Sequence, residues 1–283
     1  MTKVVADELV GAVWPSAQPG TDPVLYGHVL LDPQGSFEVR SLQTFRLVYT
    51  VGRYGIDDTG SIRVVFRFMG DWGALQTSDP KGHNYVTAQA STGARLSLHY
   101  ANTGHQRPWF KSLTVKLHGG YLSEGDTITI VFGDTSKGSL GMQMQTFCES
   151  GFEFKVLADV CAVGHYYPLA KTPSIAIVPG EVHEWKAVLP SLRKLSEVFR
   201  LGIKAEDKWG NPTDHASGIF RLQSNHSVKG LPEMIDYPLG EKSLIIDNLS
   251  VEKPGIIRIQ LLDESGQCVT EAGPLVIHEG PFS

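Results

Sequence analysis

Alternation of apolar and polar residues is the pattern that most limits what this chain can fold into. Apolar side chains recur at every second position in five runs of the first half, at 62–69, 95–100, 113–118, 127–132 and 152–157. A β-strand points successive side chains to opposite faces, so each run predicts a strand with one buried and one wetter face. Turn-forming residues separate the runs, as at 57–60 (DDTG) and 79–82 (DPKG). This spacing predicts a β-sandwich.

A second set of strands follows a stretch without periodicity at 166–173, which contains two prolines. The runs lie at 174–178, 183–189, 198–205, 218–223, 243–249, 256–262 and 274–278. Seven strands are the number found in an immunoglobulin-like sandwich. The segment 207–212 (DKWGNP) looks like a turn of bacterial immunoglobulin-like and filamin-like modules. We therefore predict an all-β chain of two β-sandwich domains, 1–168 and 169–283, the second immunoglobulin-like or filamin-like. Residues 190–197 fit a short helix or a loop equally well.

Charge and cysteine content limit the partners and the compartment. The 283 residues include 25 Lys and Arg against 30 Asp and Glu, a net charge of −5, with no basic run. Nucleic acid is therefore not an expected partner. No apolar stretch approaches the ~18 residues of a membrane span, so a membrane is not expected either. Residues 1–20 lack the apolar core of a secretory signal, and three cysteines are few for a disulfide framework. A cytoplasmic location is the expectation.

Motifs for metal, nucleophile and phosphate chemistry do not stand out, and we expect no cofactor. Ten histidines include no spaced metal signature. His99 and His118 fall on the polar faces of neighbouring predicted strands, where convergence on a metal is the alternative to solvent exposure. Cys148 directly precedes a strand and lacks a helix dipole, which favours a buried structural thiol. The glycine-rich segment 133–141 favours a hairpin loop over an anion-binding nest.

Polar and aromatic residues of the first domain gather near the ends of the predicted strands. Arginine offers forked donors and tryptophan a flat stacking surface, so this set suits a binding face. The alternative is a solvated strand face on which arginines pair with acids. The candidate binding residues are Arg53, Asp57, Asp58, Arg67, Asp71, Trp72, Asn84, Tyr85, Arg107, Trp109, Asp134 and Glu149.

Several motifs between about Ser41 and Pro212 occur in a particular order. They are 51–62 (VGRYGIDDTGSI), 107–109 (RPW), 124–128 (EGDTI), 133–134 (GD), 145–149 (QTFCE), 185–193 (WKAVLPSLR) and 201–212 (LGIKAEDKWGNP). This series resembles the N-terminal β-sandwich region of the bacterial "domain of unknown function 3604" family.

The domain composition of full-length members of that family implies a function for this chain. Full-length members resemble a β-sandwich region followed by a metal-dependent domain similar to the PHP (polymerase and histidinol phosphatase) hydrolases. That domain opens with a Trp-Gly-Asp-x-His-Gly-like segment, for which this sequence has no counterpart, so no metal ligand or catalytic residue carries over. The resemblance implies a non-catalytic β-sandwich half of a PHP-like metal-dependent hydrolase or lyase. Its partner would be a separate PHP-like metal-binding subunit, or the chain would form a homo-oligomer.

Two other functions stay open. One is a stand-alone small-molecule or carbohydrate-binding module, with a groove lined by Trp72, Trp109 or Tyr85. The other is an enzyme in its own right, which needs two carboxylates or a His–carboxylate pair in a cleft. Its acid–base residues would come from Asp57, Asp58, Asp71, Asp134, His99 and His118.

Overall fold

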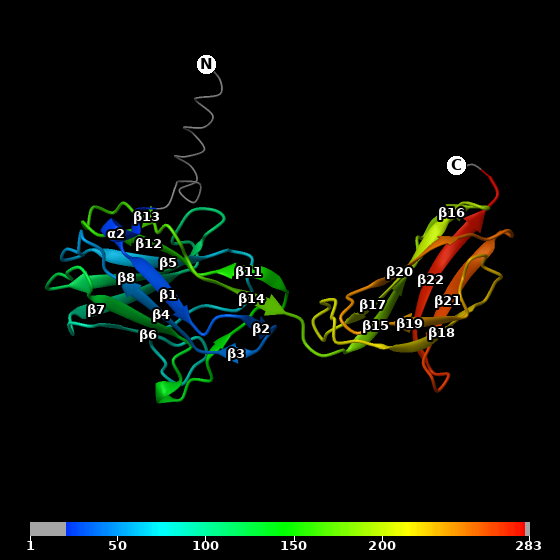
Figure 1. Ribbon diagram of the computed structural model, residues 1–283, viewed down its shortest axis with the longest axis horizontal. Helices are drawn as coiled ribbons and strands as arrows, with labels where there is room; N and C mark the ends of the chain where they lie inside the picture. The colour runs from blue at the N-terminus through cyan, green and yellow to red at the C-terminus, as the bar shows by residue number, and fades with distance from the viewer. Residues whose placement is uncertain (1–20, 281–283) are drawn as a thin grey trace, which may run out of the picture. The chain divides into compact units, whose positions relative to one another are not determined.

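The chain is all-β and divides into two compact units, as a computed structural model describing residues 21–280 shows (Figure 1). The predicted fold class of two β-sandwich domains is confirmed. Residues 1–20, for which we expected no secretory signal, and residues 281–283 lie outside the described part. No helix among residues 21–280 has the length and hydropathy needed to cross a membrane.

The boundary between the units differs from the predicted one. The first unit ends at Val178 and the second begins at Pro179, ten residues after the predicted boundary. Strand β14 (Ser174–Val178), expected in the second domain, pairs antiparallel with β11 (Glu149–Glu153) and parallel with β2 (Ser36–Glu38). Strand β14 thus belongs to the first domain.

Two antiparallel sheets pack face to face in the first domain. One has the order β1–β4–β9–β6 and the other β13–β12–β5–β8–β7. The strands of the first sheet are β1 (His28–Asp32), β4 (Phe45–Thr50), β9 (Thr127–Phe132) and β6 (Val86–Ala90). Those of the second are β13 (Tyr167–Pro168), β12 (Lys155–Asp159), β5 (Ser61–Phe66), β8 (Lys111–His118) and β7 (Arg95–Ala101).

Alternate residues of both sheets form one core. Phe45 on β4, Phe66 on β5 and Phe132 on β9 are at most 1% exposed. The rings of Phe66 and Phe132 meet edge to face at 5.9 Å, which joins the two sheets. The remaining elements of this domain are α2 (Pro23–Tyr26), β3 (Leu42–Gln43), η2 (Thr135–Lys137), β10 (Met142–Gln143) and the small sheet β11–β14–β2.

The second domain is a sandwich with its own core. A sheet of β15 (Glu184–Val188), β17 (Phe199–Glu206) and β20 (Leu244–Leu249) forms one layer. The other has the order β16 (Leu192–Lys194), β22 (Cys268–His278), β21 (Gly255–Leu262), β18 (Gly218–Ser224) and β19 (Met234–Tyr237). Leu201 and Ile257, one from each sheet, are fully buried in the shared core. Residues 190–197 contain strand β16, which pairs parallel with β22, so the expected helix or loop was wrong.

Candidate functional site

Five of the twelve sequence-predicted residues come together, four from the segment between β5 and β6 and one, Glu149, from the start of β11. Arg67 Nη1 lies 3.6 Å from Glu149 Oε1. The side-chain amide of Asn84 donates to the backbone carbonyl of Trp72 at 2.9 Å. Asp71 accepts hydrogen bonds from the backbone amide and the hydroxyl of Thr146. Segments that are far apart in sequence are thereby fastened to one another.

Hydrogen bonds decide the charge state of Asp71. Burial works to raise its pKa, but the two hydrogen bonds from Thr146 stabilise the carboxylate and the nearby Arg40 adds to this effect. The pKa of Asp71 therefore lies below its ordinary value. The carboxylate of Asp71 therefore holds the segment after β5 to the segment before β11.

A pocket of about 240 Å³ opens beside this junction. Both charged or polar and apolar side chains line it. The lining residues are Arg67, Met69, Gly70, Gln145, Phe147, Glu149, Phe152 and Glu153. We call this the Arg67–Glu149 pocket.

Gln145 presents an unpartnered carbonyl oxygen in the Arg67–Glu149 pocket. The residue is 1% exposed, and its amide nitrogen donates to Phe147 O at 3.1 Å and to Glu149 Oε2 at 3.0 Å. Because both partners are acceptors, they identify the nitrogen end of the amide. The other end, Oε1, is buried and has no hydrogen-bond donor among the described residues.

Trp72 has an unpartnered donor next to Gly70, one of the residues that line the pocket. Its indole Nε1 is buried and has no acceptor within residues 21–280. A Cβ added at Gly70 would lie 2.7 Å from Trp72 Nε1 and 2.9 Å from Gln145 Oε1. Both unpartnered atoms therefore border the same side of Gly70, where only glycine leaves room.

Lys111 supports the same corner of the domain. Its ammonium group donates to the Gly70 carbonyl and lies 4.6 Å from the centre of the Trp72 ring. Burial lowers the pKa of Lys111, while the carboxylate of Asp71 acts in the opposite direction. Lys111 thus positions Gly70 and Trp72 from the edge of strand β8.

Trp109 lies outside the pocket, on the outer face of the second sheet. It is 5% exposed and packs in a small cluster with Val65 and Leu157. Arg67 and Lys155 stand over its ring, with centroid distances of 5.4 Å and 5.0 Å. Arg67 therefore links this cluster to the pocket.

The other predicted residues are dispersed over the first domain. Arg53, Asp57 and Asp58 are exposed in the loop after β4, where Asp58 accepts from the Gly119 amide at 2.7 Å. Arg107 stacks over Phe68 at 5.2 Å. Tyr85 is buried, and Asp134 caps η2 while accepting from Thr87.

The aromatic groove expected for a carbohydrate-binding module was wrong. Trp72, Tyr85 and Trp109 are 1%, 7% and 5% exposed. Their rings pack within the domain and present no open stacking surface. Of the three, only Trp72 has a buried polar atom without a hydrogen-bond partner among residues 21–280, its indole Nε1.

The acid–base pair required by the enzyme hypothesis and the alternative of a metal site at His99 and His118 are not seen among the described residues. Among residues 21–280, no hydrogen bond joins two of the six proposed acid–base residues, and no three His, Cys, Asp or Glu side chains gather as for a metal ion. His118 lies opposite Arg95 and His99 opposite Thr114, so the two histidines are separated by about 13 Å along the strands. Cys148 is exposed, which contradicts the expected buried thiol.

Sequence reasoning missed two residues that line the pocket, Gln145 and Gly70, and one residue that holds Gly70 in place, Lys111. Gln145 belongs to a motif singled out above, but neutral amides carry no charge signal. Gly70 follows directly after a predicted strand, where a glycine reads as a turn. Lys111 lies at the first position of β8 and its role depends on a contact with the distant residue Gly70.

Comparisons with known proteins give only distant likenesses. No family model matches the chain, and no curated protein matches it. Similar solved structures include the Yersinia pseudotuberculosis adhesin InvE, with TM-score 0.25, 11% identity and coverage of 87% of this chain and 57% of that one. A type II cohesin dyad from the ScaA scaffoldin of Acetivibrio cellulolyticus has TM-score 0.24 and 9% identity, covering 89% and 96%. A marsupial T cell receptor has TM-score 0.27 and 8% identity, covering 94% and 74%.

These likenesses concern the all-β sandwich fold alone. The chain spans 57% and 53% of the first two solved structures that it matches, the Yersinia adhesin and a membrane-anchored protein of Corynebacterium diphtheriae.

Proposed function

We propose that the first domain binds a small hydroxylated molecule in the Arg67–Glu149 pocket. One observation carries the proposal: a buried donor, Trp72 Nε1, and a buried acceptor, Gln145 Oε1, both lack partners and border the same side of Gly70. A hydroxyl group can accept from the first and donate to the second. A molecule with a hydroxyl group is therefore the ligand class that this pair recognises.

The energetics favour an occupant at this point. A buried polar group without a partner costs about 1–3 kcal/mol, and two such groups stand side by side here. A ligand hydroxyl that pairs with both recovers that cost on binding. The Arg67–Glu149 ion pair, at 3.6 Å, offers a cation and a carboxylate to further polar groups of the same ligand.

Binding rather than catalysis is the proposed role of this domain. The carboxylates of Asp58, Asp71 and Asp134 each accept hydrogen bonds from backbone amides of the loops they stabilise. Such bonds hold each carboxylate in one orientation on the loop that it stabilises. These groups stabilise loops of the domain, whereas the proposed ligand binds in the Arg67–Glu149 pocket.

Titration of the full chain with glycerol, myo-inositol and D-glucose tests the proposal. Binding is expected to shift the backbone amide resonances of Gly70, Gln145 and Glu149. Trp72→Phe removes the indole donor but keeps a large ring, and it is expected to weaken binding about tenfold, equal to about 1.4 kcal/mol. Arg67→Ala is expected to weaken binding too.

Arg95→Ala is the matched control, because Arg95 is an exposed arginine on the edge strand β7. It should bind the probes as the parent chain does. The proposal fails if none of the three probes shifts the pocket resonances, or if Trp72→Phe binds as tightly as the parent while keeping its melting temperature.

A second candidate function is the accessory role implied by the family resemblance. The outer face of the β13–β12–β5–β8–β7 sheet supports it, because outward positions carry Arg63, Arg95, Lys116 and Lys155. The one carboxylate among them, Asp159, is buried and accepts from the amides of Val163 and Gly164. A cationic face on a chain of net charge −5 suits an acidic protein surface.

Affinity purification of the tagged chain from a lysate of its native cells tests this second candidate. A PHP-like metal-binding protein is expected to co-purify, and its recovery should fall when Arg63 and Lys116 are both changed to Glu. Recovery of the chain alone, as a monomer by native mass spectrometry, counts against the accessory role and leaves the pocket proposal untouched.

A further inference from the structure

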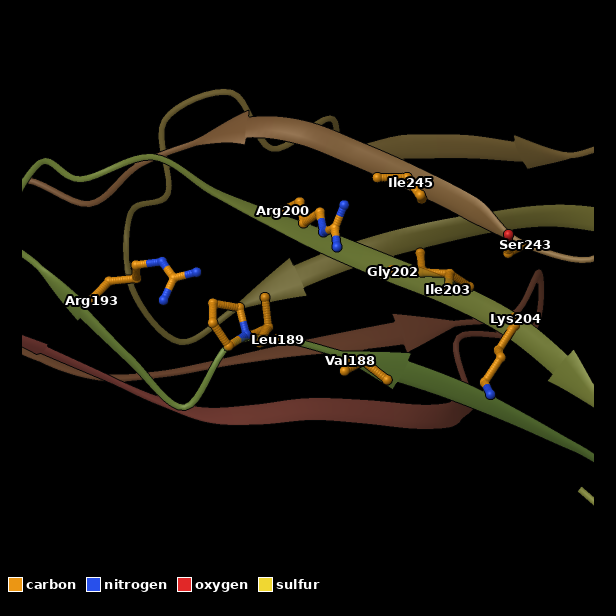
Figure 2. A pocket seen from close by; sticks show the side chains of 10 residues that line it. Val188, Leu189, Arg193, Arg200, Gly202, Ile203, Lys204, Ser243 and Ile245 are labelled. Atoms are coloured by element: carbon orange, nitrogen blue, oxygen red, sulfur yellow. The ribbon is translucent and has the colours of Figure 1, made fainter. Parts of the chain in front are cut away.

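An open groove of about 430 Å³ lies on the outer face of the three-stranded sheet in the second domain (Figure 2). Its apolar lining includes Val188 at the end of β15, Leu189 directly after it, and Ile245 on β20. Val188 and Ile245 are 57% and 51% exposed. Two aliphatic side chains thus stand in solvent on either side of the central strand β17.

Gly202 forms the floor between these side chains. On the central strand it pairs with Val188 on one side and with Ile245 on the other. The row Val188–Gly202–Ile245 therefore crosses all three strands, and its middle member has no side chain. The result is a notch with aliphatic walls.

The chain itself does not require glycine at this position. Gly202 is not in the left-handed backbone region, and a Cβ added to it would meet no atom within 4 Å. Glycine weakens the interior of a strand, and it often marks a place where another group approaches closely. The space over Gly202 is available to a side chain from another molecule.

Cationic side chains surround the notch. Arg200 and Lys204 flank Gly202 on β17 at the positions that share its outer face, and Arg193 lies at the end of the groove. Lys204 is already ion-paired with Glu206 at 2.5 Å, which leaves the two arginines for an acidic ligand. Arg200 has no carboxylate within ion-pair distance among residues 21–280. Arg193 Nε is buried without a hydrogen-bond acceptor, and its nearest carboxylate partner, on Glu197, lies at 3.7 Å.

We propose that this groove binds an acidic segment of a partner protein, which inserts one leucine or isoleucine side chain over Gly202. The aliphatic side chain would pack between Val188 and Ile245, and flanking carboxylates would pair with Arg200 and Arg193. Charge complementarity selects this occupant over a basic or neutral segment. The inference concerns a different domain from the Arg67–Glu149 pocket and is independent of the function proposed for it.

Titration of the full chain with synthetic peptides tests the proposal. The probe is the acetylated hexapeptide Asp-Glu-Leu-Ile-Asp-Glu, and the readout is the backbone amide resonances of Val188, Gly202 and Ile245. These resonances are expected to shift on binding. Replacing both central residues of the peptide with alanine should weaken binding at least about tenfold, and a Lys-Lys-Leu-Ile-Lys-Lys peptide should not bind.

Variants of the chain distinguish the contribution of the notch to peptide binding from the contribution of the charged side chains. Gly202→Val fills the notch and is expected to weaken binding at least about tenfold while leaving the fold intact. Gly151→Val is the matched control, because Gly151 also lies in a strand, with no atom within 4 Å of an added Cβ. Arg200→Glu is expected to weaken binding of the acidic peptide and to favour the basic one.

The proposal is overturned if the acidic peptide leaves the three resonances unchanged, if the basic peptide binds the parent chain equally well, or if Gly202→Val binds as the parent does. Sedimentation of the chain without peptide tests whether a second copy of the chain occupies the groove instead. Concentration-dependent dimers that Gly202→Val abolishes would show that a second copy of the chain fills the groove, and this too would overturn the proposal.

Discussion

Asp71 accepts two hydrogen bonds from Thr146, from its backbone amide at 2.8 Å and its hydroxyl at 2.7 Å. The two residues are 75 positions apart, so this contact closes a long stretch of chain beside the Arg67–Glu149 pocket. Asp71→Asn is expected to lower the free energy of unfolding by about 1 kcal/mol at neutral pH, because an amide replaces a charged acceptor.

The pH dependence of this variant follows from the lowered pKa of Asp71. The stabilisation is fully present above the unfolded-state value of 3.8 and is lost as pH falls through the lower value of the folded chain. Urea unfolding at neutral pH and well below pH 3.8 should show the difference between variant and parent shrinking. Asp236→Asn, at an exposed position on β19, is the control, and an equal effect there would contradict the prediction.

His105 is expected to make the chain less stable as pH falls from neutral. Burial, together with the charges of Arg63 and Lys155, lowers the pKa of His105 from 6.5 to about 4. The unfolded chain therefore binds more protons between these values, and stability is lost as pH falls from 6.5 towards 4. Titration of the imidazole resonances should give a midpoint near 4, and His105→Gln should flatten the pH dependence of unfolding in this interval. A midpoint near 6.5 would refute the prediction.

Asp207 organises the turn at 207–212 in the second domain. Its carboxylate accepts from the amides of Gly180, Trp209 and Asn211 at 2.8–3.0 Å, and the residue is 2% exposed. Asp207→Ala leaves these donors without a partner and is expected to lower the free energy of unfolding by about 2–3 kcal/mol. Denaturant unfolding, followed by the fluorescence of Trp209 and Trp185, measures this change in the free energy of unfolding. Asp236→Ala should change the same quantity by less than about 0.5 kcal/mol.

Two glycine-to-alanine changes are expected to have opposite effects. At Gly70 the new methyl group would lie 2.7 Å from Trp72 and would destabilise the fold by about 1–3 kcal/mol. At Gly202 it meets no atom within 4 Å, and the loss of unfolded-state entropy is expected to stabilise the chain by about 0.4–1 kcal/mol. Thermal unfolding of the two variants checks both signs, and destabilisation by Gly202→Ala would mean that the strand itself needs glycine there.

Alternation predicted most of the central strands but not the strands near the N-terminus. The run 127–132 matches β9, and 174–178 matches β14. Strand β4 was not predicted, although Phe45, Leu47 and Tyr49 alternate in it and are all buried. The run 152–157 predicted one strand, whereas the chain passes from β11 to β12 at Phe154 and joins two different sheets. A periodicity of two identifies a strand but says nothing about which sheet it enters.

The candidate site was accessible to sequence reasoning only in part. Arg67 and Glu149 were predicted because charge is visible in a sequence, and they do meet. The proposed ligand class rests on two buried atoms without hydrogen-bond partners, Trp72 Nε1 and Gln145 Oε1. A sequence cannot show that a buried atom lacks a partner, because this depends on which residues the fold brings next to it. Gly202 left a visible signal, a glycine inside a predicted strand, but its meaning required knowing that Val188 and Ile245 flank it.

Strand β14 has a consequence for anyone who divides this chain. A fragment that stops at residue 168 would lack the strand that pairs with both β11 and β2, and would leave two unpaired edges open to aggregation. A cut after Val178 keeps that pairing and leaves Gly180 with its partner Asp207. The second domain therefore begins at Pro179. Chimeric proteins in which this domain is replaced by another should be joined at that residue.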